Sequence, residues 1–256
     1  MAKSRGYFTG LSNIIRFNWH LYLLGVGVVL LLLVPSLLFS IESPLREVLV
    51  SIALMGFMSI VLSVVTSWYI YDLSGLYEYR WMDVLPERHP KNIVNIHAGY
   101  DETSGLLSER FPSSKLTVLN IFDKEQHTEF SLRQAQAAIP QSISSITARS
   151  NQLPLGNNSI DCVCLLFAAH EIRNDKERIA FFHEINRILA EDGILVVMEH
   201  RRDFANFLVY NIGAFHFFSI NTWLKTFKEA SFQMVHHLPH TPFISVFILS
   251  KNGIAP

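Results

Sequence analysis

The chain has 256 residues, of which 50% are hydrophobic and only 17% charged, whereas soluble domains carry about 25% charged residues. This composition excludes disordered, collagen-like and coiled-coil proteins, and two cysteines are too few for a small disulfide-stapled secreted fold. The formal net charge of −1 argues against a general nucleic-acid-binding surface.

Two long uncharged segments open the chain. Residues 17–41 and 48–71 contain no Asp, Glu, Lys or Arg, and each exceeds the ~20 residues that a helix needs to cross a bilayer. The short link between them is polar, so the N-terminal segment, residues 1–71, is predicted to be a two-helix transmembrane hairpin. A cleaved signal peptide fits poorly, because the first segment lies too far from Met1 and a second one follows it. A buried hairpin of a soluble protein would need a very large core.

The charges that flank the first segment predict its orientation. Lys3, Arg5 and Arg16 precede it, whereas the link that follows is slightly acidic. By the positive-inside rule, the N-terminus and everything after the second span lie on the cytoplasmic side of an inner membrane. Residues 72–90 are a juxtamembrane connector rich in aromatic residues, and residues 91–256 are a separate domain that begins where the pattern changes.

Short apolar runs alternate with helix-like stretches in this domain. The expected strands are residues 92–99, 115–122, 142–149, 159–169, 193–200, 232–237 and 243–250, and the expected helices are residues 101–111, 131–139 and 174–189. This alternation predicts an α/β fold: a Rossmann-like, mostly parallel sheet that ends in an antiparallel C-terminal hairpin.

In such sheets a ligand binds outside the carboxyl ends of the strands, where the strand order reverses. The candidate site residues therefore directly follow the strands, in residues 97–101, 120–123, 149–151, 170–173 and 199–202.

One stretch of the domain carries a recognisable combination of residues. Leu153-Pro154 and Asp161 surround the start of an apolar strand, and the next helix and strand contain Glu184, Arg187, Leu189 and Gly193. This combination resembles the second half of class I S-adenosylmethionine-dependent methyltransferases, which carry "LP…D-x-V" and then "E-x-x-R-x-L-x-x-x-G". Residues 223–235, WLKTFKEASFQMV, resemble that family's "L-x-x-A-G-F" step, with Ser231 in place of Gly. The resemblance covers roughly residues 92–251.

The resemblance implies S-adenosylmethionine as cofactor, and it places six candidate cofactor-binding residues. The family's acidic residue and the glycine-rich loop after it fall on Asn95, His97, Gly99 and Asp101, where only Gly99 keeps a glycine. The ribose-binding acid falls on Asn120, with Asp123 three residues on, and the adenine-binding acid falls near Arg149. Either Asp101, Glu102 and Asp123 rebuild the site, or the domain has lost methyl transfer.

The acceptor side is predicted at the ends of the fourth and fifth strands. His170, the candidate general base, and Glu171 are the candidate catalytic residues, and the alternative is a structural ion pair within this loop. Six residues are candidates for acceptor binding: Arg173, Glu199, His200, Arg201, Phe207 and Tyr210. Surface pairing of Arg201 and Arg202 with Asp203, and core packing of the aromatic stretch 204–223, are the alternatives. His236, His237 and His240 lack an accompanying carboxylate or Cys pattern, so no metal site is expected.

The sequence therefore predicts a membrane-anchored methyltransferase that acts on a lipophilic or membrane-associated acceptor at the cytoplasmic face of the bilayer. The alternative is a catalytically inactive methyltransferase fold, tethered to the membrane as a binding subunit for a membrane protein partner. A nicotinamide-dependent dehydrogenase is third, because the chain lacks G-x-G-x-x-G after the first strand.

Overall fold

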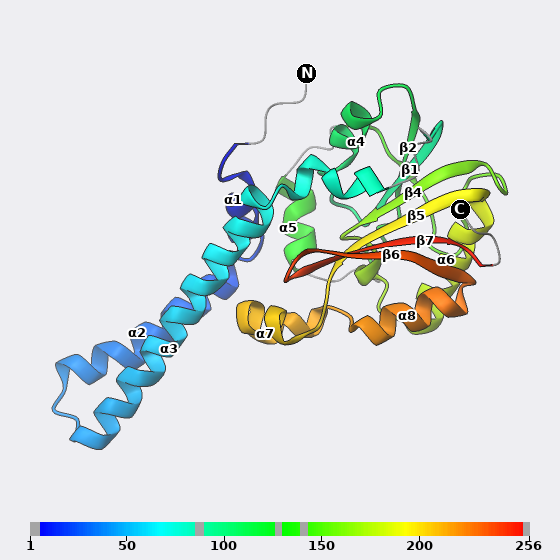
Figure 1. Cartoon of the computed structure of the whole chain (residues 1–256). Helices are drawn as coiled ribbons and strands as arrows, with labels where there is room; N and C mark the ends of the chain where they lie inside the picture. The colour runs from blue at the N-terminus through cyan, green and yellow to red at the C-terminus, as the bar shows by residue number, and fades with distance from the viewer. Residues whose placement is uncertain (1–5, 85–89, 126–129, 139–142, 253–256) are drawn as a thin grey trace. The chain divides into compact units, whose positions relative to one another are not determined.

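A computed structural model describes residues 6–84, 90–125, 130–138 and 143–252 (Figure 1). Contacts between Cα atoms divide the chain into two compact units. One is N-terminal and contains residues 5–76 with residues 208–210, and the other contains residues 77–207 and the chain from residue 211 onward. Lys3 and Arg5, used above to predict orientation, lie outside the described residues.

The N-terminal unit is helical. Its elements are α1 (Thr9–Phe17), α2 (Trp19–Leu38), α3 (Ser43–Trp68) and a π-helical turn, η1 (Tyr69–Leu73). Two helical segments, Trp19–Leu38 and Ser43–Glu78, are long and apolar enough to cross a membrane. Their large apolar side chains are mostly exposed, with Leu31 at 72% and Leu38 at 74%. The two apolar helices predicted at residues 17–41 and 48–71 are thus present.

Asp72 ties the first helix of this unit to the end of the third. Its carboxylate accepts the backbone N–H groups of Gly10 (2.7 Å) and Leu11 (2.8 Å), which satisfies donors at the start of α1. The ring of Phe8 stacks on that of Trp68 with centroids 5.5 Å apart. The short amphipathic helix α1 is therefore held against the end of α3 and η1 at two places: its first turn, through Asp72, and the residue before it, Phe8.

The second unit is built on one seven-stranded sheet. Its strands are β1 (Asn92–His97), β2 (Lys115–Asn120), β3 (Ile146–Thr147), β4 (Ile160–Leu166), β5 (Leu189–His200), β6 (Phe232–Thr241) and β7 (Ile244–Lys251). Their order across the sheet is β3-β2-β1-β4-β5-β7-β6 (Figure 1). The first five strands pair in parallel, whereas β7 pairs antiparallel with β5 and β6. The predicted Rossmann-like sheet with an antiparallel C-terminal hairpin is confirmed.

Helices connect these strands. The longer ones are α4 (Ser104–Arg110), α5 (Phe130–Ala138), α6 (Asp175–Ile188), α7 (Phe204–Tyr210) and α8 (Ile220–Glu229). Short 3₁₀ turns lie at η2 (Leu76–Glu78), η3 (Arg80–Val84), η4 (Ala169–Glu171) and η5 (Asn211–His216).

Several boundaries differ from the prediction: for example, β4 ends at Leu166 rather than at residue 169, and β5 begins at Leu189 rather than at residue 193. The helix expected from residue 101 begins at Ser104, because Asp101 Oδ1 accepts the N–H groups of Thr103 and Ser104 and forms the turn before it. The third strand is only two residues long within the described chain, and residues 139–142 lie outside it.

Buried side chains cover both faces of the sheet. On one face Val163, Leu165, Leu195 and Val197 join Phe181, Phe182, Trp223 and Phe227 of α6 and α8 in a single core cluster. The alternate strand positions, Cys162, Cys164, Val196 and Ile248, are buried as well. Burial on both faces is what a mostly parallel sheet requires.

The residues that carry the family resemblance are structural. Arg187 forms an ion pair with Glu184 (2.8 Å) and donates to the carbonyl oxygens of Leu153 and Leu155, while Glu184 accepts the N–H of Leu153 (2.9 Å). The hydrogen bond from Arg187 lowers the pKa of Glu184. This pair therefore fastens the loop before β4 to α6.

Asp161 and Gly193 hold neighbouring strands together near the amino-terminal ends of β1 and β4. Asp161 Oδ2 accepts the backbone N–H groups of Lys91 (2.7 Å) and Asn92 (2.8 Å), which holds the start of β1 against β4. A Cβ on Gly193 would lie 2.9 Å from the carbonyl oxygen of Ile160, so any side chain there would push β5 away from β4.

Candidate functional site

The strand order reverses between β1 and β4, and the predicted site residues lie at the carboxyl ends of these strands and their neighbours. The turn after β4 is strained, because Phe167 adopts a φ of +56°, which a bulky side chain disfavours by about 1–3 kcal/mol. This turn leads into η4, which carries His170 and Glu171.

A buried polar network fills the end of β1. The side-chain amide of Asn95 donates to Thr103 Oγ1 (2.9 Å) and Ser104 Oγ (2.8 Å). Asp101 Oδ1 accepts the backbone N–H groups of Thr103 (3.1 Å) and Ser104 (3.0 Å). The acid predicted to take part in cofactor binding therefore also shapes the loop.

Within the described part of the chain, three atoms of this network are buried without a hydrogen-bond partner: Asn95 Oδ1, His97 Nε2 and Asp101 Oδ2. His97 Nδ1 accepts the N–H of Gly99 (3.2 Å), so the proton of the neutral ring lies on Nε2. Burial lowers the pKa of His97, and the Asp101 carboxylate offsets this only in part, which keeps the ring neutral. One donor and two acceptors thus await a polar ligand, which fits the hydroxyl, amine and carboxylate groups of S-adenosylmethionine.

Gly99 is required by close packing at this point. Its φ is +95°, and a Cβ there would lie 2.1 Å from Gln136 Nε2 and 3.0 Å from the ring of Phe122. The absence of a side chain at Gly99 therefore leaves space that the Gln136 side chain of α5 occupies.

The other predicted cofactor residues follow β2 and β3. Asn120 pairs in register with His97, and its Oδ1 accepts the N–H of Phe122 (3.0 Å). Asp123 is exposed and accepts the N–H of Glu125 (2.8 Å). Arg149 is exposed, and its backbone forms an isolated antiparallel β-bridge with that of Gln152. Only Asn120 among these three is held beside the β1 network, and all six cofactor roles stay predictions.

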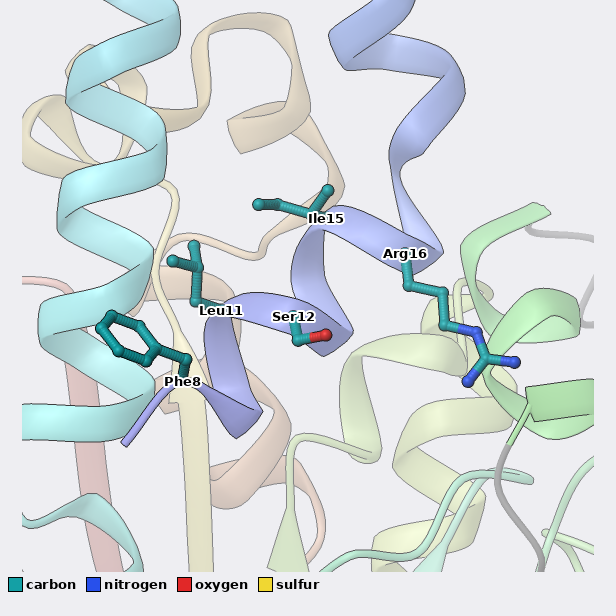
Figure 2. Close-up of a pocket in the computed structure, with 5 residues that line it drawn as sticks. All are labelled: Phe8, Leu11, Ser12, Ile15 and Arg16. Atoms are coloured by element: carbon teal, nitrogen blue, oxygen red, sulfur yellow. The ribbon is translucent and has the colours of Figure 1, made fainter. Parts of the chain in front are cut away.

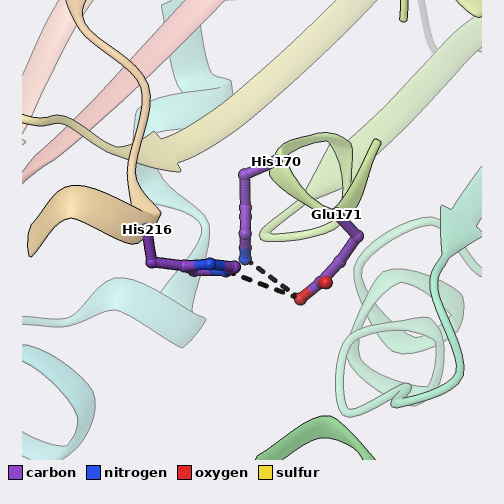
Figure 3. A group of neighbouring side chains, drawn as sticks. All are labelled: His170, Glu171 and His216. Carbon is purple, nitrogen blue, oxygen red and sulfur yellow. Dashed lines mark ion pairs between the residues drawn. The ribbon is translucent and has the colours of Figure 1, made fainter. Parts of the chain in front are cut away.

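A compact acid–histidine cluster lies at the ends of β4 and β5 (Figure 3). His170 Nδ1 is 2.6 Å from Glu199 Oε2, and the other Glu199 oxygen accepts the N–H groups of Ala169 (2.9 Å) and His170 (3.2 Å). On the other side of the ring, His170 Nε2 is 3.3 Å from Glu171 Oε1, and His216 Nε2 is 3.9 Å from the same oxygen. The side chains of His170 and Glu171 are largely buried and that of Glu199 fully so.

The electrostatics of this cluster favour a protonated imidazole. Burial alone would lower the pKa of His170, but the charges and hydrogen bonds of Glu199 and Glu171 outweigh it and hold that pKa well above 6.5. The structure thus brings together the predicted catalytic pair, His170 and Glu171, and the predicted acceptor-binding residue Glu199.

Two arginines position this cluster. Arg173 donates to the carbonyl oxygens of His170 and His216, and its guanidinium lies 4.5 Å from the centroid of the Phe218 ring. Arg178, which is 1% exposed, donates to the carbonyl of Ile172 (3.1 Å) and lies on the same ring at 4.1 Å. Sequence reasoning missed Arg178, which belongs to no motif, and it included His216 and Phe218 only as members of the aromatic stretch 204–223.

The other predicted acceptor-binding residues have separate surroundings. His200 is buried, stacks on Phe217 with centroids 4.8 Å apart, and lies 3.1 Å from Asn206 Oδ1. Arg201 forms an ion pair with Asp203 (3.2 Å), which is the bland alternative anticipated for it. Phe207 is 44% exposed and meets Phe215 edge-on, whereas Tyr210 belongs to the N-terminal unit. Their acceptor roles stay predictions.

Two hollows lie away from these residues. One, of about 440 Å³, is lined by Phe8, Leu11, Ser12, Ile15 and Arg16, along one side of α1 (Figure 2). The other, of about 280 Å³, lies between α6 and α8 and is lined in part by Arg178 and Thr226. None of the predicted site residues lines either of them.

Comparisons with known proteins now bear on this fold. Residues 96–197 match the family model described as a methyltransferase domain. No curated protein matches the sequence. Among solved structures, a protein from Pyrococcus horikoshii OT3 is 12% identical with a TM-score of 0.51, covering 68% of this chain and 87% of its own. An O-methyltransferase family 2 protein from Planctomyces limnophilus, in complex with apigenin, is 12% identical with a TM-score of 0.50, covering 80% and 69%.

A third structure shows how widely this fold is used. The cyclase SpnF is 11% identical with a TM-score of 0.51, covering 71% of this chain and 81% of its own. At these identities the solved structures show the fold alone. Residues 96–197 are similar to a methyltransferase domain, and the sheet that contains them has the fold of the solved structures it resembles.

Proposed function

We propose that this protein is a membrane-anchored methyltransferase that transfers a methyl group from S-adenosylmethionine to a hydroxyl of a lipophilic acceptor, at the cytoplasmic face of a membrane. The observation that carries the proposal is the juxtaposition of two polar sites at the strand-order reversal, one beside β1 and the other beside β4. The β1 site offers unpartnered polar atoms for a cofactor, and the β4 site offers groups able to take up a proton.

The cofactor would be held by residues at the end of β1. When bound, S-adenosylmethionine supplies an electrophilic methyl group on a positively charged sulfur. His97 Nε2–H would donate to an acceptor atom of the ligand, and Asp101 Oδ2 would accept from a hydroxyl or amine. Asn120, one strand over, would contact the ribose.

The His170 cluster would take up the proton that the acceptor hydroxyl loses. Methyl transfer to oxygen is mainly a matter of positioning, with a base needed only for that proton. Glu199 orients His170 through Nδ1, and this leaves Nε2, beside Glu171, as the atom that faces a substrate.

Exposed apolar side chains support a lipophilic acceptor. Phe204 is 75% exposed, Ile212 80% and Phe215 58%, and all three lie in α7 and η5, which follow β5. Soluble monomers rarely expose so many large apolar side chains in one short stretch, and such surfaces commonly meet lipid or an apolar ligand. The exposed apolar helices α2 and α3 support residence in a bilayer, where the effective concentration of a lipophilic acceptor is high.

A second function is favoured by one observation. The Gln136 side chain lies over Gly99, where the family's cofactor approaches the backbone. A domain that keeps this side chain in place would be a binding subunit without methyl transfer, tethered to a membrane protein partner.

The experiment uses the full chain in detergent. S-adenosylhomocysteine is titrated into it by calorimetry, and radiolabelled S-adenosylmethionine is then supplied with membrane lipid extracts. The methyltransferase proposal predicts micromolar binding, together with label in a lipid fraction that His170→Ala reduces by about 10²–10⁴-fold. Folded protein that binds no S-adenosylhomocysteine, or binds it but labels no lipid in any extract, would contradict it.

A further inference from the structure

We propose that His170, Glu171 and His216 (Figure 3) form a binding site for one divalent transition-metal ion, with Glu199 as the carboxylate that orients His170. No metal-binding spacing in the sequence points to this site, because the three ligands come from two elements far apart in the chain: η4 supplies His170 and Glu171, and η5 supplies His216.

Potential ligand atoms of His170, Glu171 and His216 converge in this cluster. His170 Nδ1 faces the Glu199 carboxylate at 2.6 Å and therefore donates its hydrogen there. In the metal-free cluster Nε2 carries a proton; once an ion displaces that proton, the lone pair of Nε2 points toward Glu171 Oε1, and His216 Nε2 faces the same oxygen. A proton or a metal ion between these atoms would offset the negative charge of the Glu171 carboxylate.

The distances favour the metal ion. A charge-assisted N–H···O hydrogen bond is about 2.7–2.9 Å long, yet His170 Nε2 and Glu171 Oε1 are 3.3 Å apart. Two ligands of a tetrahedral zinc ion, each about 2.0–2.1 Å from the metal, are separated by about 3.3 Å. The candidate ligand atoms all lie within 4.8 Å of one another, so a small movement of His216 completes the set.

The surroundings of the ligands match those of known metal sites. A metal-binding histidine commonly donates its second N–H to a carboxylate, which fixes the ring, and Glu199 is placed to do this. Arg173 donates to the carbonyl oxygens of both His170 and His216, so it clamps the two ligand residues together. The carboxylates of Glu171 and Glu199 supply two negative charges, which balance a divalent ion.

The ligand types select the kind of ion. Two imidazoles and one carboxylate suit zinc and its first-row neighbours, whereas magnesium and calcium prefer oxygen ligands. Three protein ligands leave one tetrahedral position open, as in catalytic rather than structural zinc sites. An oxygen of water or of the acceptor hydroxyl fits that position, and with the ion bound Nε2 would be a ligand, so the ion would replace it as the group that favours loss of the hydroxyl proton. This last point rests on the proposed function, while ion binding itself does not.

The test is calorimetric titration of Zn²⁺ into the full chain in detergent, purified without a polyhistidine tag and stripped with a chelator. We expect one equivalent to bind, His216→Ala and Glu171→Gln to weaken binding at least 10-fold, and Glu199→Gln to weaken it about 10–100-fold. Co²⁺ should give the visible absorption of a four-coordinate site, and His216→Ala should abolish that signal. Mg²⁺ should bind far more weakly.

His236→Ala is the matched control, because His236 is an exposed histidine on β6 and lies near a second histidine that could bind metal adventitiously. It should bind Zn²⁺ as the parent protein does. The proposal is overturned if the parent binds no stoichiometric Zn²⁺, if His216→Ala binds it equally well, or if His236→Ala removes the binding. Binding of S-adenosylhomocysteine to the same metal-free samples reports on folding and on the cofactor site separately, so failure of one proposal is distinguishable from failure of the other.

Discussion

Glu199 contacts His170 at two points: one carboxylate oxygen lies 2.6 Å from Nδ1 of the ring, and the other accepts the backbone N–H of the same residue at 3.2 Å. The first contact determines that Nδ1 of the ring carries a hydrogen, and the second holds the backbone of His170 in place. Because Glu199 ends β5 and His170 follows β4, this contact between adjacent strands determines where the imidazole lies. The same pair anchors both proposals above.

The first prediction concerns the pH dependence of methyl transfer in metal-free protein. A general base acts in its neutral form, and the paired carboxylates hold the pKa of His170 well above 6.5. We therefore expect kcat/KM to rise with pH through an apparent pKa above 6.5. Glu199→Gln keeps an oxygen for the backbone N–H groups but removes a charge, so it should move this rise to lower pH.

Glu229→Gln, a change at a half-exposed carboxylate on α8, is the control for that experiment and should leave the profile in place. A profile that Glu199→Gln does not move would mean that His170 is not the titrating base.

The second prediction concerns the two side chains that decide cofactor binding. His97→Ala removes a buried donor that has no protein partner, and we expect about 10-fold weaker binding of S-adenosylhomocysteine, or about 1.4 kcal/mol. Gln136→Ala removes the side chain over Gly99 and should strengthen binding instead. Calorimetry on both variants measures whether the affinity for S-adenosylhomocysteine falls or rises. A change in the same direction in both variants would contradict this description of the site.

The third prediction concerns Arg178, which holds the loop that carries His170. Its guanidinium is buried and donates to the Ile172 carbonyl, to Thr226 Oγ1 (3.3 Å) and to Asp175 (2.6 Å). Arg178→Met leaves these acceptors without a donor, so it should lower the free energy of unfolding by about 2–4 kcal/mol. Arg178→Lys should recover only part of this, because an ammonium lacks the planar fork.

Lys225→Met, at an exposed position of α8, is the control for Arg178 and should stay within about 0.5 kcal/mol of the parent. Urea unfolding followed by tryptophan fluorescence measures the difference. A fully stable Arg178→Met would show that Arg178 does not hold the loop.

Much of the fold could be predicted from local pattern. The run IDCVCLL is apolar at nearly every position because β4 is covered on both faces, and a parallel neighbour on each side follows from that. Asn174 stands where an N-cap is expected, and its side chain accepts the N–H groups of Lys176 and Glu177. Patterns of this kind are local, so one sequence suffices to read them.

The site was only half predictable for the same reason. His170 and Glu199 follow adjacent strands, so strand order alone predicts that they meet. His216 follows Arg173 by 43 residues, and its approach depends on how η5 folds back after α7. No spacing in the sequence encodes that path. Asn95 falls on the family's cofactor loop, but its hydrogen bonds to Thr103 and Ser104 were not predicted, because a buried amide inside a strand leaves no periodic signal.

The last prediction concerns acid stability and rests on His200. Burial lowers the pKa of this histidine from 6.5 to about 4, although hydrogen bonds from its ring to Asn206 and Phe243 oppose the shift. Between about pH 6.5 and 4 the unfolded chain binds a proton at this residue and the folded chain does not, so stability falls as pH falls. The loss amounts to about 3 kcal/mol over the window, at about 1.4 kcal/mol per pH unit. His170 acts oppositely, since its raised pKa adds stability below pH 6.5 that is lost as pH rises through the folded-state value. The thermal midpoint of the parent should therefore fall relative to that of His200→Phe, which keeps a ring to stack on Phe217, as pH falls from 7 to 4. Parallel curves for the two proteins would show that His200 does not carry the acid sensitivity.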